Sequence, residues 1–227
     1  MLIAGLQKNS TLDFPGRFSS VIFLAGCNYD CYFCHNRHII GENVKSVNLI
    51  PEEEVLAFLE KRKGLLEGVV ITGGEPALQK DAIPFAKKVR DLGYDIKLDT
   101  NGSRPEFVKE FLMRDLVDYV AVDYKAPFDM YPQICAHDAS GVAETLDLLK
   151  KSGIEFEMRT TVIPELREAE LIRMAQEIEP LEHYFLQLYR PVKPEIVKKG
   201  MEPYTPMQLK ALAELIKDYQ PSVQTRA

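Results

Sequence analysis

The strongest constraint on the fold is a regular alternation of short apolar runs with amphipathic helical patterns. Six runs rich in β-branched residues have the length of β-strands; they span residues 19–26, 68–73, 95–100, 118–123, 156–163 and 183–189. Apolar residues recur at helical spacing after most of these runs, and Pro51 and Pro105 stand at the expected first positions of two helices. Strand-then-helix units in series predict an α/β fold with a parallel sheet and right-handed crossovers. Periodicity alone leaves an open Rossmann-like sheet and part of a barrel as alternatives.

The composition is that of an ordinary globular protein, with 46% hydrophobic and 27% charged residues in a chain of 227. A chain of this length can bury a full core, so we expect a single domain over residues 1–227, with its core at about 18–190 and a C-terminal helix at about 205–218. The net charge of −6 argues against nucleic acid as a partner, because phosphate binding requires a basic face. The sequence has no long apolar run and no basic-then-apolar N-terminal pattern, so we expect a cytoplasmic protein without a membrane partner.

Two stretches lack a strand or helix pattern. Residues 125–140 are expected to form a long loop after the fourth strand, and residues 220–227 a loose tail. The loop carries Phe128, Met130 and Tyr131, which are residue types suited to contact with another protein. Packing of this loop against the end of the sheet is the alternative interpretation.

Polar residues and glycines gather where the predicted strands end. They are Cys27, Cys31 and Cys34 after the first run, Gly73, Gly74 and Glu75 after the second, Asp99 and Thr100 at the third, Asp123 and Lys125 at the fourth, and Gln187 and Tyr189 at the sixth. The C-terminal ends of parallel strands meet at one edge of a sheet. The pattern therefore predicts one shared active face.

The most specific chemical feature is a group of three cysteines within eight residues. They are Cys27, Cys31 and Cys34. Their spacing lets one loop place three thiolates around a single metal centre, either a four-iron cluster with one open iron or a zinc ion with His35 or His38 as a fourth ligand. Cys135 lies far away in the sequence, and we expect it to be a free, buried thiol.

The cysteine segment and its flanks resemble a known family. The spacing is similar to the signature of the radical S-adenosylmethionine (SAM) superfamily, and the residues from Phe23 to Asn36 resemble the activating enzymes of glycyl radical enzymes. The segments LQKNSTLDFPG, VITGGEP at 70–76 and KLDTNG at 97–102 are similar to anaerobic ribonucleoside-triphosphate reductase activating proteins. This resemblance extends from about residue 3 to the middle 120s. It implies a partial (β/α)6 barrel, a [4Fe–4S] cluster on the three cysteines, and SAM chelating the open iron.

The resemblance also implies contacts for the cofactor. Phe33 matches an aromatic residue that packs beside the adenine, while Gly73, Gly74 and Glu75 match a segment that receives the methionine ammonium. Thr100 belongs to a segment that is either part of the site or a turn that ends the third strand.

Four charged residues complete the implied site. Asp123 and Lys125 match an Asp-x-Lys pair around the methionyl part and its carboxylate, with a structural ion pair as the plainer alternative. Asp99 together with Asp123 is expected to hold a monovalent cation, and Arg159 is a further candidate for the cofactor pocket. Gln187 stands where a relative can carry a histidine.

The implied function is the removal of a glycine α-hydrogen from a glycyl radical enzyme, with anaerobic ribonucleotide reductase as the first candidate partner. A low-potential donor such as flavodoxin or ferredoxin would reduce the cluster. One rival is a radical enzyme acting on a small molecule, for which Arg190, Lys193 and Lys198 offer an anion site. A second rival is a non-catalytic iron–sulfur or zinc module, which leaves the Gly-Gly-Glu and Asp-x-Lys segments without a role.

Overall fold

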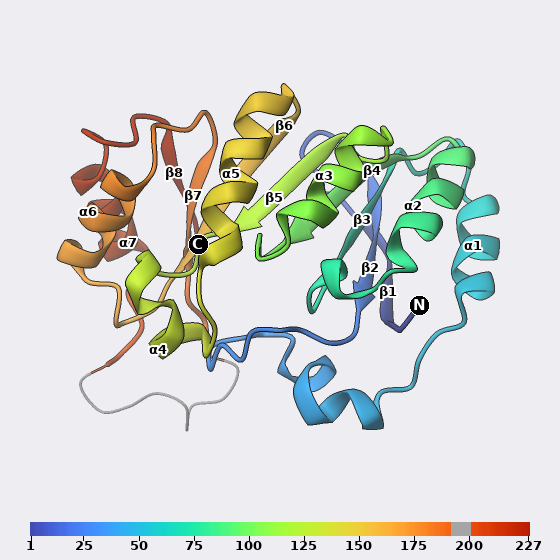
Figure 1. The fold of residues 1–227 in the computed structure, drawn as a ribbon, viewed down its shortest axis with the longest axis horizontal. Helices are drawn as coiled ribbons and strands as arrows, with labels where there is room; N and C mark the ends of the chain where they lie inside the picture. The colour runs from blue at the N-terminus through green and yellow to red at the C-terminus, as the bar shows by residue number, and fades with distance from the viewer. Residues whose placement is uncertain (192–200) are drawn as a thin grey trace.

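One eight-stranded sheet, with its strands in chain order, forms the centre of the molecule (Figure 1). The computed structural model describes residues 1–191 and 201–227. The strands are β1 (Ile3–Ser10), β2 (Ser19–Leu24), β3 (Gly68–Gly73), β4 (Asp95–Thr100), β5 (Tyr119–Asp123), β6 (Glu155–Val162), β7 (Tyr184–Leu188) and β8 (Val223–Arg226). β1 pairs antiparallel with β2, and all later pairs are parallel. The predicted α/β fold with six parallel strands is thus confirmed in β2–β7, as an open sheet of the partial-barrel kind.

Helices connect the strands and cover the outer face of this sheet (Figure 1). The α-helices are α1 (Glu52–Glu60), α2 (Ala82–Asp91), α3 (Pro105–Met113), α4 (Tyr131–Cys135), α5 (Ser140–Ser152), α6 (Glu168–Glu177) and α7 (Pro206–Leu215). Among the described residues the 3-10 helices are η1 (Arg37–Ile39), η2 (Gly41–Ser46), η3 (Pro76–Leu78) and η4 (Phe128–Met130). In α2 the buried residues recur at helical spacing, from Ala82 through Phe85 and Ala86 to Val89, so one stripe faces the sheet. No helix in the described parts of the chain is long and apolar enough to span a membrane.

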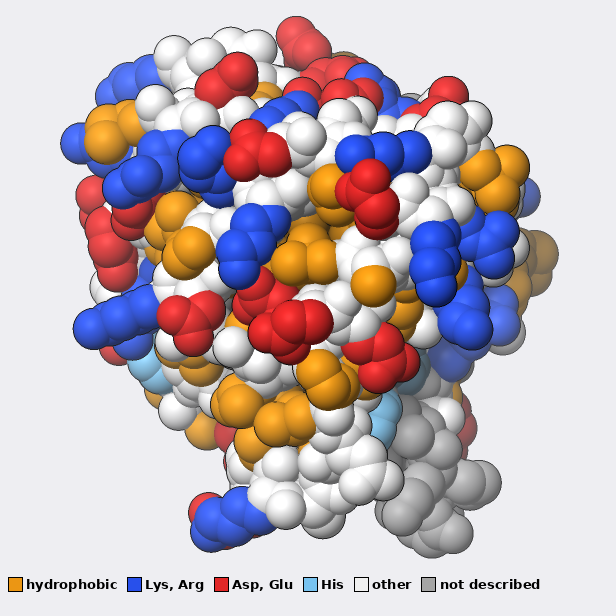
Figure 2. Space-filling view, turned by 90° about the vertical axis from the view of Figure 1, so that its right-hand side faces the viewer, with side chains coloured by type: hydrophobic (Ala, Val, Ile, Leu, Met, Phe, Trp, Pro, Cys, Tyr) orange, Lys and Arg blue, Asp and Glu red, His pale blue; other side chains and the backbone are white. Residues whose placement is uncertain are grey.

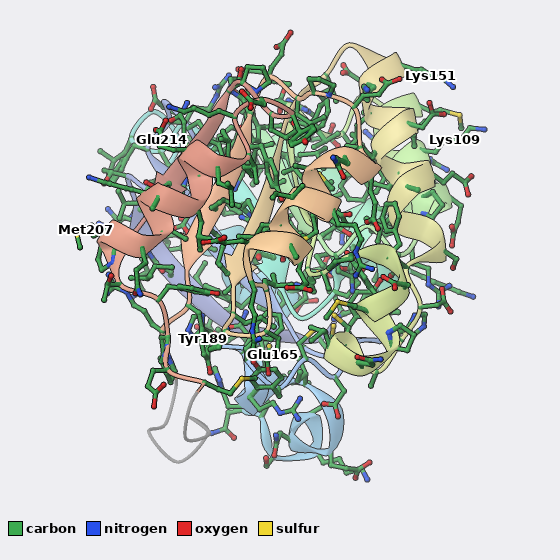
Figure 3. The ribbon with its side chains drawn as sticks, turned by 90° about the vertical axis from the view of Figure 1, so that its left-hand side faces the viewer. Lys109, Lys151, Glu165, Tyr189, Met207 and Glu214 are labelled. Carbon is green, nitrogen blue, oxygen red and sulfur yellow. The ribbon has the colours of Figure 1, made fainter. Side chains whose placement is uncertain are left out.

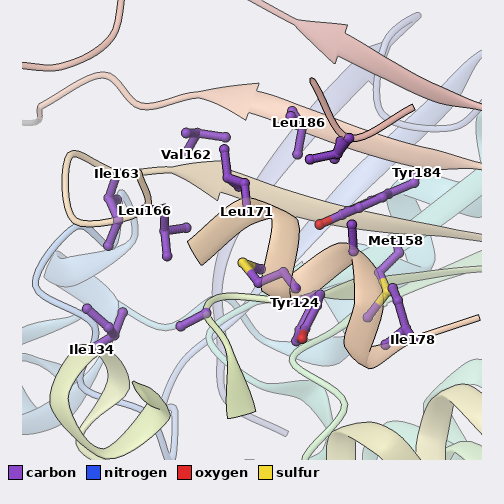
Figure 4. Packing of buried hydrophobic residues seen from close by; sticks show 14 of the residues in the cluster. Tyr124, Ile134, Met158, Val162, Ile163, Leu166, Leu171, Ile178, Tyr184 and Leu186 are labelled. Carbon is purple, nitrogen blue, oxygen red and sulfur yellow. The ribbon is translucent and has the colours of Figure 1, made fainter. Parts of the chain in front are cut away.

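The main core lies between the sheet and the helices. Figure 4 shows the part of it beside α6, where Tyr124, Met158 and Leu171 pack together in the cluster. The face around α1 and α2 carries interspersed positive and negative side chains with small apolar areas between them (Figure 2). Apolar burial thus fixes the helices on the sheet and leaves its concave face for polar residues.

The connection between β1 and β2 fills one end of the concave face. Phe14 is 1% exposed and packs with Val21, Val70 and Tyr119 in a small cluster. A Cβ at Gly68 would lie 2.7 Å from the Phe14 ring, so this strand position requires glycine. Residues before β2 therefore close the end of the sheet opposite to the cysteines.

Two predicted irregular segments are ordered elements. The expected loose tail at residues 220–227 is wrong, because Val223–Arg226 pairs with β7 as strand β8. Gln220 is fully buried and bonds the Leu181 amide at 3.0 Å, which anchors the segment before this strand. The expected loop at 125–140 contains η4 and α4. β8, η4 and α4 are all too short for the periodicity of apolar residues to reveal them.

Candidate active site

A polar cavity of about 370 Å³ lies at the C-terminal ends of the parallel strands. Eleven of the residues predicted for the site line this cavity: Cys27, Cys31, Phe33, Cys34, Gly73, Gly74, Asp99, Thr100, Asp123, Lys125 and Arg159. These residues come from the cysteine loop and from strands β3 to β6. The structure therefore brings together all the predicted site residues at one cavity except Glu75.

The cysteine loop follows β2, and Gly26 begins it with φ +90°. The Cys27 sulfur accepts hydrogen bonds from the Tyr29 amide at 3.4 Å and from Asn101 Nδ2 at 3.9 Å. Burial raises the pKa of Cys27 to about 11 and raises the pKa of Cys34 as well. The surroundings alone thus favour protonated thiols, and a positively charged metal centre is the partner that would hold them as thiolates.

Cys135 is a free, buried thiol, as expected, and it lies against Cys31 although the two are far apart in the sequence. A hydrogen bond from the Cys135 thiol lowers the pKa of Cys31 to about 7, and the same bond raises the pKa of Cys135. The Cys135 carbonyl also accepts the Asp30 amide at 2.9 Å. Helix α4 is therefore part of the wall behind the cysteine loop.

The glycine pair after β3 packs against the chain that leads into the cysteine loop. Gly73 has φ +117°, and the Gly74 amide donates to the Leu24 carbonyl at 2.7 Å. A Cβ at Gly74 would lie 1.8 Å from the Gly26 carbonyl oxygen. Asn36 adds a bond from Nδ2 to the Gly73 carbonyl at 2.7 Å. The close approach that requires glycine here is between two parts of the backbone, in addition to any approach to a cofactor.

Glu75 does not line the cavity, although it follows two glycines that do. Its side chain is fully buried, and its carboxylate accepts hydrogen bonds from Thr100 Oγ1 at 2.7 Å and from the amides of Asn101 and Ala77 at 2.6 and 3.0 Å. Burial raises the pKa of Glu75 to about 7 despite these donors. The carboxylate ties the end of β3 to the end of β4, and the binding of an ammonium group by the segment Gly73-Gly74-Glu75 stays a prediction.

Charged side chains on neighbouring strands form one network. Arg159 donates from Nε to Asp123 Oδ1 at 2.9 Å and from Nη1 to Asp99 Oδ2 at 3.1 Å. The Lys97 ammonium lies 2.8 Å from Asp99, and the Lys125 ammonium 3.2 Å from Asp123. Burial would raise the pKa of Asp123, but Arg159 and Lys125 outweigh burial and hold it at about 2.

This network also surrounds the place expected for a monovalent cation. The guanidinium of Arg159 bridges Asp99 and Asp123 and supplies positive charge between them. A monovalent ion held by these two carboxylates stays a prediction. The Asp-x-Lys pair is an ion pair, as the plainer interpretation has it, and it also lines the cavity.

Aromatic rings form the wall next to the cysteines. Phe33 contacts Tyr32 and Tyr189 edge to face, with ring centroids 5.4 and 6.4 Å apart. The Tyr32 hydroxyl donates to Glu165 at 2.5 Å, and Figure 3 shows Glu165 and Tyr189 close together at this end of the molecule. Gln187 lines the cavity at the end of β7, whereas Tyr189 is buried behind Phe33.

The residue after the third cysteine holds the cysteine loop against a later segment. Nε2 of His35 donates to the Arg190 carbonyl at 2.7 Å, which ties the cysteine loop to the segment after β7. Of the residues considered for an anion site, Arg190 is exposed, and Lys193 and Lys198 lie outside the described residues.

Two contributors to the site had only weak signals in the sequence. Asn101 bonds Asn28 Oδ1 at 2.9 Å as well as the Cys27 sulfur, so the Asn-Gly turn after β4 also supports the cysteine loop. Asp13 lines the cavity from the connection after β1, a strand that periodicity does not indicate.

The three cysteines of the loop are the donors available for a metal centre at the cavity. His35, a suggested fourth zinc ligand, is bonded to a carbonyl instead. The three cysteines line one cavity, and the Cys27 sulfur accepts two hydrogen bonds there, an arrangement that suits thiolates around a cluster.

Comparisons with known proteins agree with this chemistry. A family model described as the Radical SAM superfamily matches residues 21–178. A "putative glycyl-radical enzyme activating enzyme" of Methanocaldococcus jannaschii is 35% identical over 198 residues, covering 84% of this chain and 80% of that protein. A "probable GTP 3',8-cyclase" of Thermococcus kodakarensis is 28% identical over 201 residues, covering 78% of this chain and 64% of that protein.

A solved structure supports the fold. A domain of pyruvate-formate lyase-activating enzyme from Bacteroides vulgatus superposes with a TM-score of 0.58 at 16% identity, covering 71% of this chain and 99% of that domain. The family model spans more than half of this chain, and the Methanocaldococcus relative matches most of it. The chain therefore belongs to the radical SAM superfamily, whose enzymes use a [4Fe–4S] cluster and S-adenosylmethionine.

Proposed function

We propose that this protein activates a glycyl radical enzyme by removing a hydrogen atom from a glycine α-carbon of that partner. The observation that carries the proposal is the cavity itself, in which three cysteines of one loop face the charged residues of β4, β5 and β6. The similarity to a protein named as a glycyl-radical enzyme activating enzyme supports the choice of substrate class.

In this proposal Cys27, Cys31 and Cys34 would hold the cluster beside the site for SAM. With both groups bound, a one-electron donor acting through the cluster would cleave SAM into methionine and the 5′-deoxyadenosyl group, which would supply the hydrogen-atom abstraction. The role of the protein is to hold the cofactor in one orientation and to keep water away from the radical.

The side chains divide this work among them. Lys125 keeps two ammonium hydrogens beyond its bond to Asp123, so it can bind the cofactor carboxylate as a point charge. Arg159 keeps Asp123 ionised and fixed. Phe33, held by Tyr189, offers an apolar edge for the adenine.

We propose anaerobic ribonucleoside-triphosphate reductase as the partner, reduced flavodoxin or ferredoxin as the electron donor, and the open side of the sheet as the entry for the partner's glycine loop. The resemblance of the segments at 70–76 and 97–102 supports the choice of reductase. Phe128 and Met130 are half-buried near the site and remain candidates for contact, whereas Tyr131 is fully buried and is not available to a partner.

The test is a reconstituted activation assay. The loaded protein, SAM, dithionite and the reductase from the same organism should give the electron paramagnetic resonance doublet of a glycyl radical, and α-deuterated glycine should pass its label into 5′-deoxyadenosine. Lys125→Gln should lower SAM affinity and radical yield, while Lys109→Gln, at an exposed position of α3 (Figure 3), should change neither.

The assay also separates the rival function. The similarity to a protein named as a GTP cyclase keeps a small substrate as the second candidate. If no reductase acquires a radical, while GTP stimulates 5′-deoxyadenosine release, the glycyl radical proposal is refuted and the small-molecule function is supported.

A further inference from the structure

A buried carboxylate on β6 connects the cofactor cavity to the C-terminal strand. Glu157 is 1% exposed and precedes Arg159 by two positions, so both side chains point to the concave face of the sheet. Its carboxylate accepts Arg226 Nη1 at 2.9 Å, Arg226 Nη2 at 2.6 Å and the Tyr119 hydroxyl at 3.1 Å. The nearest nitrogen of Arg159 lies 3.9 Å from the same carboxylate.

Arg226 is held in place by two independent contacts. Besides the two bonds to Glu157, its guanidinium lies over the Phe185 ring at 3.5 Å from the centroid. β8 brings it there, because Arg226 is the register partner of Gln187, which lines the cofactor cavity. A bidentate pair of this kind fixes direction as well as charge.

The charges along this line alternate in sign. Arg226 neutralises Glu157, Arg159 lies between Glu157 and the pair of Asp99 and Asp123, and the ammonium of Lys125 follows. A second cavity of about 500 Å³ is lined by Arg226 and Glu157, and it shares Arg159 with the cofactor cavity. Neighbouring charged side chains therefore connect Arg226 on β8 to Lys125 at the cofactor cavity.

Removal of Arg226 would leave the buried Glu157 carboxylate short of positive charge. Burial by itself raises the pKa of Glu157, and the bonds from Arg226 together with Arg159 hold it below its ordinary value. The closest remaining cation is Arg159, so Glu157 would compete with Asp99 and Asp123 for that guanidinium.

We propose that Arg226 is a positioning residue for cofactor binding: by neutralising Glu157, it keeps Arg159 on Asp99 and Asp123 and leaves Lys125 free for the cofactor carboxylate. The inference rests on the proposed site of the cofactor, though not on the identity of the partner enzyme. It assigns a role in the active site to the C-terminal strand.

The test measures SAM binding to the anaerobically reconstituted protein by equilibrium dialysis. Arg226→Gln should keep the iron content and weaken SAM binding by about tenfold, the size typical when a residue that orients a ligand-binding side chain is removed. The double variant Arg226→Gln with Glu157→Gln should recover to within about twofold of the wild type, because a neutral amide no longer competes for Arg159. The control is Arg114→Gln, which removes an exposed ion pair to Glu110 on α3 and should not change binding.

Recovery of SAM affinity in the double variant distinguishes the proposed positioning role from a role in which Arg226 only holds β8 on the sheet. If Arg226 and Glu157 served only to hold β8, the two substitutions would each weaken SAM binding and their effects would add. Unchanged affinity in Arg226→Gln, or a double variant as weak as the single one, overturns the inference. If Arg226→Gln fails to take up iron, the double variant is the deciding measurement. Recovery of both its iron content and its SAM affinity supports the inference, and failure to recover overturns it. Wild-type protein that loads iron but does not bind SAM would refute the proposed cofactor site itself.

Discussion

Replacement of Gly74 by alanine should separate the cysteine loop from the sheet. The added Cβ would lie 1.8 Å from the Gly26 oxygen and 2.6 Å from the Gly26 carbonyl carbon, so the two backbone segments must move apart. This movement strains two backbone hydrogen bonds. The Gly74 N–H donates to the Leu24 carbonyl at 2.7 Å, and the Glu75 N–H donates to the Gly26 carbonyl at 2.8 Å. Neither segment can yield easily, because the clash is with backbone atoms.

The magnitude follows from these contacts. Two buried backbone hydrogen bonds contribute about 1 kcal/mol each, and forcing an extra carbon into a packed site costs about 1–3 kcal/mol. We therefore expect Gly74→Ala to lower the free energy of unfolding by about 3–5 kcal/mol. Gly93→Ala is the matched control, because Gly93 has φ +91° but no atom within 4 Å of an added Cβ, and it should cost only about 1–2 kcal/mol of backbone strain.

The assay is urea unfolding of the metal-free, reduced protein, followed by measurement of iron after reconstitution. The metal-free form matters, because a loss of stability there has no contribution from bound cofactor. Gly74→Ala should also retain less iron than Gly93→Ala, since the displaced segment carries Cys27. Equal unfolding free energies for the two variants would refute the steric argument and would favour a need for glycine only in cofactor binding.

Three further predictions use the same unfolding measurement. The raised pKa of Glu75 adds stability that is fully present below the unfolded pKa of 4.5 and is lost as the pH rises through about 7. Glu75→Gln should remove this pH-dependent loss of about 3 kcal/mol, and an unchanged profile would contradict it. Phe14→Ala should cost about 3–5 kcal/mol because it empties the end of the concave face, whereas Leu12→Ala, at a side chain 91% exposed, should cost under about 0.5 kcal/mol. Tyr131→Phe should cost about 1–2 kcal/mol, since its hydroxyl accepts the Lys125 amide at 3.0 Å, and no loss would show that water replaces it.

Local pattern was enough to predict the six central strands and the edge where the site lies. Strands β2–β7 are apolar runs, and their ends carry the residues that line the cavity. The apolar pattern did not predict which of the residues at the strand ends point their side chains into the cavity. Glu75 follows two glycines that belong to the cavity wall, yet its own side chain turns to Thr100 and Asn101, because those donors lie on a neighbouring strand end.

Contacts between distant segments account for what the sequence did not reveal. Cys135 meets Cys31 only because α4 packs under the cysteine loop, and four-residue β8 is too short to show alternation. Arg159 was predicted as a site residue, but its bridge between Asp99 and Asp123 depends on the register of β4, β5 and β6. Register is a property of the assembled sheet, and a single sequence does not display it.

The strand order has a consequence for biosynthesis. Each strand pairs with the one next to it in the chain, so the sheet can grow one unit at a time while the polypeptide leaves the ribosome. The cysteine loop and its support from β3 and β4 emerge early, whereas Arg226 lies in the last strand of the order. Iron loading and cofactor binding should accordingly be acquired at different chain lengths, which ribosome-stalled chains ending after β5 and after β8 would reveal. Under the roles proposed for the three cysteines and for Arg226, a nascent chain would bind iron before it could bind SAM.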